Sequence, residues 1–419
     1  MSNLINKAIF ILPPGFGKSS TKNFGTVYSL IPLQNNAFQR LSSTTYNDKD
    51  LIVKTAVKHE PREAWESGES CPDYLSSGSF KNELPNNNVF TDPPFKFSFT
   101  QVVSTREPDP TAGLLASRLS NLQVGEFFTN RMTYSPTLTG TVVSFSGYLK
   151  AETMTKAWFV INDKICREIR FQDEQIVNGW LDMTSENYFD RLTKLANGWF
   201  RYEIVWKQSF SAQLVNFHLY TNPGGGGFTV NPQNSTLVIY GWQVTTTPTF
   251  TALQNNDATV PTVEADVLSF LVPIFDDNNR RPFYLAGHVK NQKTFTTTNI
   301  NPISVYDINT PLTEYFIAFF NYDYVNDLFS ILIQARLWQG DAIETFTVDL
   351  PGADVKFEIG IFRDEITVNY EGASSIVRHA TASTEFKPGL TLNKLALFSA
   401  IKETVGWNGK IKELICYEA

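Results

Sequence analysis

The sequence predicts a mainly β protein with two tandem antiparallel β-sandwich (jelly-roll) domains behind a loop-rich N-terminal arm. Aromatic residues make up 14% of the chain, with 33 Phe and 16 Tyr, and such residues favour strands. Short runs alternate apolar and polar residues, and Gly, Asn and Pro separate them. Long runs of Ala, Glu, Lys and Leu, which favour helices, are missing.

The composition is that of a folded chain. Its 419 residues are 42% hydrophobic and 18% charged, which allows two or three domains with cores of their own. The net charge of −7 and the lack of a Lys/Arg block argue against nucleic-acid binding. No window approaches the roughly 20 apolar residues of a membrane span. Since Pro13 ends the short apolar run Ala8–Leu12, we expect neither a signal peptide nor membrane insertion, and synthesis in a cytoplasm.

Residues 1 to 95 read as an extended arm for attachment and oligomerisation. Turn-forming residues recur throughout this segment, and its apolar residues come in short bursts without helical period. Such a segment cannot bury much apolar surface by itself. We therefore expect the arm to fold against another protein or against a second copy of this chain.

Two strand-rich blocks follow the arm. In the first, residues 96–250, strands are expected at 95–99, 143–148, 158–161, 199–206, 214–220 and 237–244. Helices are expected only at Pro110–Leu122 and Asn187–Ala196. Residues 251–262 belong to a polar Thr/Pro/Asn stretch and are expected to be a linker. The second block, residues 263–419, has expected strands at 268–275, 284–289, 314–320, 329–337, 346–350, 355–362, 366–370, 394–398 and 410–417.

Nothing in the sequence assembles a catalytic site. Sugar hydrolysis needs two carboxylates facing each other, and the best-spaced pair, Glu264 and Asp266, lies just after the linker without a third acid in register. Asp364 and Glu365 are adjacent and point to opposite faces of a strand. The four histidines are scattered, and His218 is expected on a sheet surface. We therefore expect a protein that is not an enzyme.

The three cysteines stand far apart in the sequence. Cys71, Cys166 and Cys416 are an odd number, which argues against a disulfide framework, and their spacing argues against a zinc site. We expect Cys166 and Cys416, which lie in apolar runs, to be small buried hydrophobes.

Sugar binding requires exposed aromatic faces beside amides and carboxylates. In the first block these residue types gather in one irregular stretch, which contains Asn178, Trp180, Asp182 and Tyr188. Trp338 and Asp341 are the matching features of the second block. For Trp180, partial burial or a subunit contact competes with ligand binding. Four other tryptophans lie in strand-like runs and are expected in the core: Trp158, Trp199, Trp206 and Trp242.

Two oxygen-rich turns are the candidate metal sites. One contains Asp276 and Asp277, and the other contains Asn321, Asp323 and Asp327. Ca²⁺ takes several oxygen ligands from one loop. Turns favour the same residues for their geometry alone, so we interpret both as plain turns. Ca²⁺ is then the one cofactor that the sequence leaves open.

The arm resembles the leader of a family of phage virion proteins, called tail-fibre or structural proteins in phages of Bacteroidetes-type hosts. The matching pieces follow the order of that family. They are residues 4–7, 28–32, 38–47 (FQRLSSTTYN), 61–65 (PREAW) and 71–75 (CPDYL). The family continues the last piece into a Leu-Glu-Pro segment, where this chain has Ser76-Ser77-Gly78. The resemblance implies a virion appendage whose arm attaches it to other virion proteins, a homo-oligomer that is a dimer or trimer, and no catalysis.

The two blocks also resemble known sandwiches. Residues 146–151, 198–202 and 239–244 look like the early, middle and closing strands of carbohydrate-binding-like domains. Residues 357–372 and 407–414 look like the central hairpin and terminal strand of laminin-G or concanavalin-like jelly rolls. These resemblances imply contact with glycans.

Three hypotheses about function follow. The first is a structural component of a phage virion, a fibre or decoration appendage on tail or head. The second is a receptor-binding module of the tail that recognises host glycans, and the third is a glycan depolymerase. The first two are compatible, and the absence of paired carboxylates disfavours the third.

Overall fold

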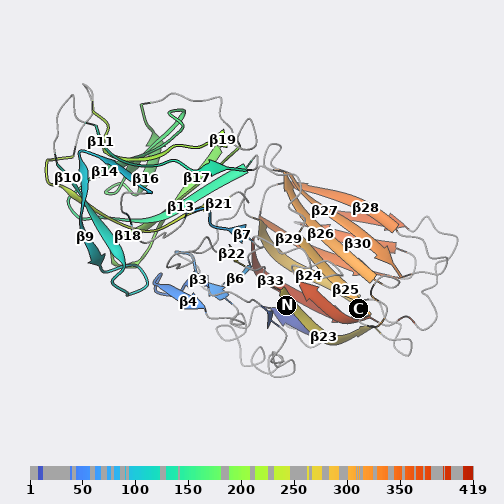
Figure 1. Cartoon of the computed structure of the whole chain (residues 1–419). Coiled ribbons are helices and arrows are strands. Elements are labelled where there is room, and N and C mark those ends of the chain that lie inside the picture. Colours follow the sequence, from blue (N-terminus) through green and yellow to red (C-terminus); the bar gives the residue numbers. More distant parts are fainter. Residues whose placement is uncertain are drawn as a thin grey trace. The chain divides into compact units, whose positions relative to one another are not determined.

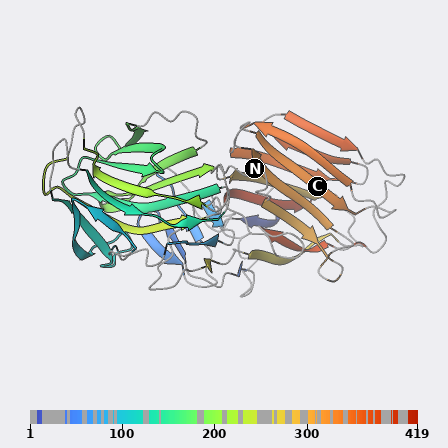
Figure 2. The same ribbon diagram turned by 45° about the horizontal axis from the view of Figure 1, so that its top comes forward.

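The computed structural model shows a β protein (Figures 1 and 2). It divides the chain into two compact units, residues 50–55 with 80–263 and residues 1–49 with 56–79 and 264–419. The structure describes residues 8–12, 38–39, 44–56, 62–67, 73–76, 80–84, 90, 94–122, 129–139, 142–180, 188–207, 213–224, 231–245, 262–263, 267–275, 283–291, 301–307, 309, 311, 315–323, 328–337, 344–351, 354–362, 365–370, 373–378, 390, 392–397 and 409–418.

The first unit is a sandwich of two six-stranded antiparallel sheets. We call them sheet I and sheet II. Sheet I has the order β17 (Tyr188–Lys194), β18 (Trp199–Lys207), β13 (Val142–Ala151), β21 (Thr236–Thr245), β10 (Ala116–Asn121) and β9 (Thr100–Glu107). Sheet II has the order β16 (Gln175–Asn178), β15 (Ile165–Arg170), β14 (Lys156–Ile161), β20 (Phe217–Asn222), β11 (Asn130–Tyr134) and β8 (Lys96–Ser98).

An aromatic core lies between the two sheets. Trp242 of β21 is 1% exposed, and its ring meets those of Phe145 and Phe159 edge-on at centroid distances of 5.0 and 6.3 Å. Phe217 of β20 joins the same cluster. Since side chains alternate along a strand, Trp158 and Val160 on either side of Phe159 point to the opposite face of sheet II.

A β-bulge in sheet I depends on two glycines. The register of β13 and β21 shifts between Ser146 and Tyr148, and Gly241 on the partner strand has a φ of 61°. Opposite it, a Cβ on Gly147 would lie 2.8 Å from Cδ1 of Trp242. Glycine is therefore required at Gly147 for the core tryptophan to fit and at Gly241 for its backbone angle.

The second unit is also built of antiparallel sheets. One sheet has the order β31 (Ala373–Arg378), β30 (Glu365–Tyr370), β29 (Asp354–Ile361), β24 (Phe283–Asn291), β33 (Gly409–Glu418), β6 (Asp73–Ser76) and β5 (Arg62–Ala64), with β1 (Ala8–Leu12) also paired to β33. The other has the order β2 (Phe38–Gln39), β23 (Val267–Phe275), β32 (Leu392–Leu397), β25 (Asn301–Tyr306), β26 (Tyr315–Asp323), β27 (Leu328–Arg336) and β28 (Glu344–Pro351).

Several segments of the expected N-terminal arm are built into these sheets. β24 pairs along one side of β33, while β6 and β1 pair with residues 409–411 and 414–417 of β33. In the first sandwich, Leu84, Phe90 and Phe95 are at most 1% exposed in the core. These described segments therefore form backbone hydrogen bonds with other strands of the chain or bury their side chains in its core. The turn-rich sequence alone did not indicate this.

The two expected helices are strands, so those predictions were wrong. Residues 116–121 form β10, a strand buried on both faces, and residues 188–194 form β17. A loop before β10 is fixed by Asp109, whose carboxylate accepts hydrogen bonds from the backbone N–H groups of Thr111, Gly113 and Leu115 at 2.8, 3.0 and 3.1 Å. The helix was expected from the spacing of three apolar residues, Leu114, Leu115 and Leu119. Pairing of residues 116–121 with the neighbouring strands outweighed that pattern.

The expected strands of both blocks are confirmed. The expected linker, residues 251–262, lies outside the described residues except for Thr262, which begins β22 (Thr262–Val263), paired with β7 (Phe80–Lys81). The remaining described elements are short: β3 (Thr44–Asn47), β4 (Val53–Ala56), β12 (Thr137–Leu138), β19 (Gln213–Leu214) and the 3₁₀ turn Ala196–Gly198. Across the described ranges, no helix has the length and hydropathy to cross a bilayer.

Candidate ligand-binding face of the first sandwich

The outward face of sheet II carries a transverse row of aromatic and charged side chains. Strand register places Arg131 of β11 beside Tyr220 of β20, Tyr220 beside Trp158 of β14, and Trp158 beside Glu168 of β15. We call this surface the Trp158 face. The alternation of β14 produces it, because the residues flanking Trp158 point into the core.

Trp180 packs over the aromatic centre of this face. Its ring lies 6.3 Å from that of Trp158 and meets that of Tyr220 edge-on at 5.2 Å between centroids. Trp158 and Tyr220 are buried, and Trp180 is half-buried. Val160 and Cys166 complete the cluster, and Cys166 is buried as expected. Trp180 is thus a partly exposed aromatic side chain packed on a buried cluster.

Gly179 allows the chain to bring Trp180 to this position. Its backbone N–H donates to the carbonyl of Cys166 at 3.0 Å, and a Cβ at this position would overlap the Cys166 sulfur. Only glycine permits so close an approach to β15.

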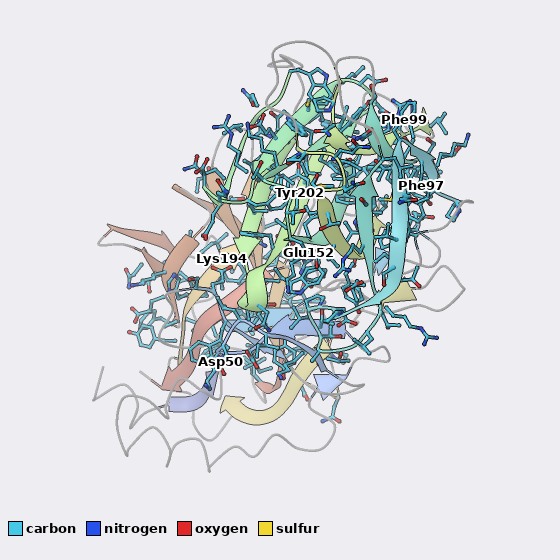
Figure 3. All side chains as sticks on the ribbon, turned by 90° about the vertical axis from the view of Figure 1, so that its left-hand side faces the viewer. Asp50, Phe97, Phe99, Glu152, Lys194 and Tyr202 are labelled. Atoms are coloured by element: carbon cyan, nitrogen blue, oxygen red, sulfur yellow. The ribbon has the colours of Figure 1, made fainter. Side chains whose placement is uncertain are left out.

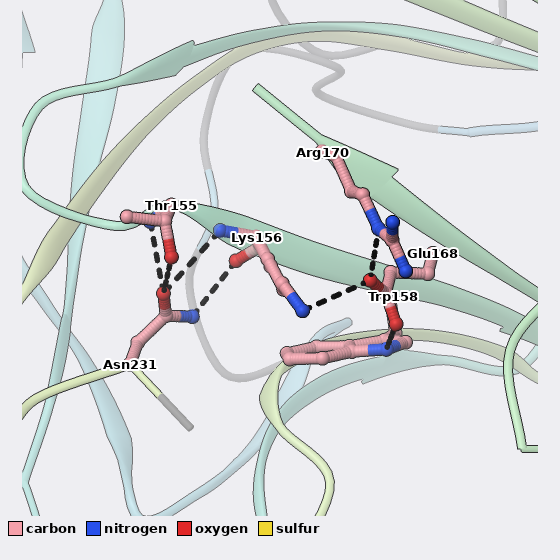
Figure 4. Close-up of polar contacts among 6 residues, drawn as sticks. All are labelled: Thr155, Lys156, Trp158, Glu168, Arg170 and Asn231. Carbon is pink, nitrogen blue, oxygen red and sulfur yellow. Dashed lines mark hydrogen bonds and ion pairs between the residues drawn. The ribbon is translucent and has the colours of Figure 1, made fainter. Parts of the chain in front are cut away.

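Glu168 organises the charges beside Trp158 (Figure 4). Its carboxylate accepts a hydrogen bond from Trp158 Nε1 at 3.1 Å. It also forms ion pairs with Lys156 Nζ at 3.2 Å and Arg170 Nε at 2.7 Å. Burial by itself raises the pKa of Glu168, but the bonds from Arg170 and Lys156 outweigh it and lower that pKa below its ordinary value. Glu168 is therefore held as a carboxylate and is not poised to deliver a proton.

Asn231 fixes the start of β14 (Figure 4). Its Oδ1 accepts hydrogen bonds from the backbone N–H groups of Thr155 and Lys156 at 2.9 and 3.3 Å. Its Nδ2 donates to the carbonyls of Lys156 and Thr221 at 2.8 and 2.7 Å. This buried amide joins β14 to β20 and so positions Lys156 beside Glu168.

At the other end of the row, Arg131 lies against Tyr220. Its Nη1 donates to the Tyr220 hydroxyl at 3.0 Å, and its Cζ lies 5.8 Å from the ring centroid. His218 faces outward in the next row, where its Nδ1 lies 2.9 Å from Thr133 Oγ1. His218 is on the outer face as expected but is only 6% exposed. Burial and the charge of Arg131 lower the pKa of His218, so it is neutral at pH 7.

Asn178 and Tyr188, two of the predicted ligand-binding residues, converge on Arg167 rather than on Trp180. Arg167 Nη1 bonds to Asn178 Oδ1 and, at 3.1 Å, to the Tyr188 hydroxyl, while its Nε bonds to Asp190 at 2.6 Å. Burial raises the pKa of Asp190, and Arg167 offsets part of that rise. Tyr202 lies close by in the packed interior (Figure 3), with its own pKa raised mainly by burial. This cluster links sheets I and II.

Most other predicted site residues lie outside the described residues: Asp182, Trp338, Asp341, Asp276, Asp277 and Asp327. Asn321 and Asp323 belong to the end of β26, where they pair with Ser330 and Leu328 of β27. Within the described ranges, no three His, Cys, Asp or Glu side chains are grouped to hold a metal ion.

Sequence reasoning missed the charged members of the Trp158 face. Arg131, Lys156, Glu168 and Arg170 come from three strands, so their proximity is set by strand order and not by sequence spacing. Glu168 and Arg170 stand two positions apart on β15 and therefore share a face, which was the available signal.

Comparisons with known proteins add little. No family model matches the sequence, and no curated protein matches it. Domains LG4-5 of the mouse laminin α1 chain are a similar solved structure, with 8% identity, a TM-score of 0.26 and coverage of 85% of this chain and 93% of that one. At this TM-score the similarity carries no argument about ligands or partners.

Proposed function

We propose that this chain is a non-enzymatic structural component of a phage virion, a fibre or decoration appendage whose first sandwich contacts host-surface glycans. The virion assignment is supported by short pieces of the N-terminal arm, such as FQRLSSTTYN at residues 38–47, that resemble the leader of phage virion proteins and follow its order. The glycan contact is supported by the Trp158 face. A receptor-binding module of the tail is the alternative, and it shares the same binding surface.

The observation that carries the glycan contact is the half-buried ring of Trp180, backed by Trp158 and Tyr220. Tryptophan rings offer a flat apolar surface for the C–H groups of a sugar ring, and charged side chains at the edge bind its polar substituents. Arg131 stands on one side of this cluster, and Lys156 and Arg170 on the other. The Trp158 face therefore offers an aromatic surface for a sugar ring and charged side chains for its polar substituents.

Three buried or half-buried carboxylates of the first sandwich support a non-catalytic role. Glu168 pairs with Lys156 and Arg170, and Asp190 pairs with Arg167. On the outer face of sheet I, the fully buried Glu203 accepts a hydrogen bond from Arg191 Nε at 2.8 Å. Each is engaged by a cation rather than facing a second carboxylate, whereas glycoside hydrolysis needs two facing carboxyl groups.

Two experiments test this proposal. Antibody labelling of purified particles in the electron microscope should place the protein on the virion, and its absence from particles would refute the virion role. Separately, the full chain should bind host-surface polysaccharide, and Trp180→Ala should weaken that binding at least about tenfold, on the scale of a lost stacking contact. Leu115→Ala removes an apolar side chain that is 48% exposed beside β10 of sheet I, and it serves as the matched control.

A further inference from the structure

We propose that the glycan recognised by the Trp158 face is acidic, a polysaccharide that carries carboxylates at repeated positions. This inference rests on the proposed glycan contact and adds the chemical class of the ligand. Among the described strand residues, four cations from four strands point outward on this face, and they stand against one carboxylate. They are Lys96 of β8, Arg131 of β11, Lys156 of β14 and Arg170 of β15, against Glu168.

The positive charge of this face contrasts with the charge of the chain. The whole protein has a net charge of −7. On the Trp158 face, the single negative charge of Glu168 is shared between Lys156 and Arg170, so these three side chains together carry one net positive charge. Among the described residues, three acids lie in the turns at either end of β15, namely Asp163, Asp173 and Glu174, and Glu174 pairs with Lys194 of β17. Asp163 is 72% exposed, so solvent screens most of its effect.

Arg131 is the best-placed group to bind a ligand carboxylate. Among the described residues it has no carboxylate partner, and its hydrogen bond to the Tyr220 hydroxyl holds the guanidinium at the aromatic cluster. A guanidinium can donate two parallel hydrogen bonds to one carboxylate, which gives both affinity and orientation. Because Trp180 also contacts Tyr220, a sugar stacked on Trp180 would lie near this guanidinium.

The spacing of the cations favours a ligand with repeated charges. Arg131 and Lys156 lie on β11 and β14, which flank β20 on either side and are therefore two strand spacings, or about 10 Å, apart. Lys156 is also two residues away along β14 from the row that contains Arg131 and Trp158, which adds to the distance between the two cations. Lys96 lies one strand beyond Arg131, in the row of Thr133 and His218. A single carboxylate reaches one of these cations, whereas a chain of acidic sugars reaches several.

The test compares one polymer in two forms. Binding of the full chain to polygalacturonate is measured by calorimetry at increasing salt, beside the same polymer after chemical reduction of its carboxyl groups to neutral hydroxymethyl groups. We expect the acidic form to bind at least about tenfold more tightly at low salt, and this preference to shrink as salt rises.

Variants locate the effect on the face. Arg131→Gln should reduce affinity for the acidic form about tenfold, while Arg131→Lys should recover only part of that loss, because the charge remains but the two parallel hydrogen bonds do not. Lys96→Gln should make the salt dependence shallower. Arg106→Gln on β9 of sheet I removes an exposed cation elsewhere and should change neither quantity. Thermal melting of each variant identifies any loss of binding that comes from unfolding.

The outcomes separate this inference from the proposed function. Equal binding of both polymer forms, still weakened by Trp180→Ala, overturns the acidic ligand and leaves the glycan contact standing. A preference for the acidic form that Arg131→Gln and Lys96→Gln leave unchanged also overturns it, because the charge would then act elsewhere. Binding of neither form overturns the acidic ligand, and the glycan contact is then decided by the titration with host-surface polysaccharide.

Discussion

The aromatic core of the first sandwich and the Trp158 face lie on opposite sides of sheet II, and they use tryptophan differently. Inside, Trp242 is 1% exposed and contacts Phe90, Phe95, Phe145 and Phe159. Outside, the half-buried Trp180 contacts Trp158 and Tyr220 beside charged groups. The difference teaches that one sheet can pack a core on one side and carry the proposed recognition surface on the other, because adjacent strand residues face opposite ways. Four predictions test this division.

The largest effect is expected for Trp242→Ala. The change removes a fully buried indole from a close-packed core, so the free energy of unfolding should fall by about 3–5 kcal/mol. Denaturant unfolding of the full chain measures it. A loss below about 1 kcal/mol would contradict the assignment of Trp242 to the inner core.

Asn231→Ala should follow in size. The substitution leaves the backbone N–H of Thr155 and the carbonyl of Thr221 without the amide that bonds them. A buried polar group without a partner costs about 1–3 kcal/mol, and we expect a total loss of about 3 kcal/mol. Gln233→Ala is the control, since its bond to the Leu122 carbonyl is exposed. Equal losses in the two variants would show that the Asn231 network adds nothing to stability.

Trp180→Ala separates recognition from stability. Because this ring is half-buried, the free energy of unfolding should fall by only about 1 kcal/mol, whereas glycan binding should weaken markedly. Thermal melting and calorimetric titration are measured on the same sample. A drop in stability as large as that of Trp242→Ala would place Trp180 in a core and remove the contrast between the two faces.

Glu168→Gln should have the smallest effect on stability, visible mainly in its pH dependence. The pKa of Glu168 is lowered by folding, so its contribution is present above the ordinary glutamate value of 4.5 and is lost as pH falls through the folded pKa. At pH 7 the variant should lose at most about 1 kcal/mol, since Arg170 is partly exposed. Unfolding curves between about pH 7 and 3 should show a shallower acid loss in the variant than in the parent. Identical slopes would mean that the ion pairs do not lower the pKa of Glu168.

Sequence reasoning could single out candidate residues that are near one another in the chain, and these stay predictions, but it could not find residues that strand pairing brings together. Trp180 was singled out because it stands beside Asn178 in an irregular stretch, and the structure does place it at a surface of the sandwich. Arg131 and Glu168 are 37 positions apart and meet in one row through β20 and β14. Only the strand order brings them together.

The sequence by itself determined the β class, the strands of both blocks and the burial of Trp158, Trp199, Trp206 and Trp242. These properties follow from a period of two residues, which is local. The tertiary structure decided that Pro110–Leu122 contributes β10 rather than a helix, and that Ala8–Leu12 and Asp73–Ser76 pair with β33. Backbone N–H and C=O groups along a strand edge pair with segments that are distant in the sequence, and no local pattern encodes which segment will pair there.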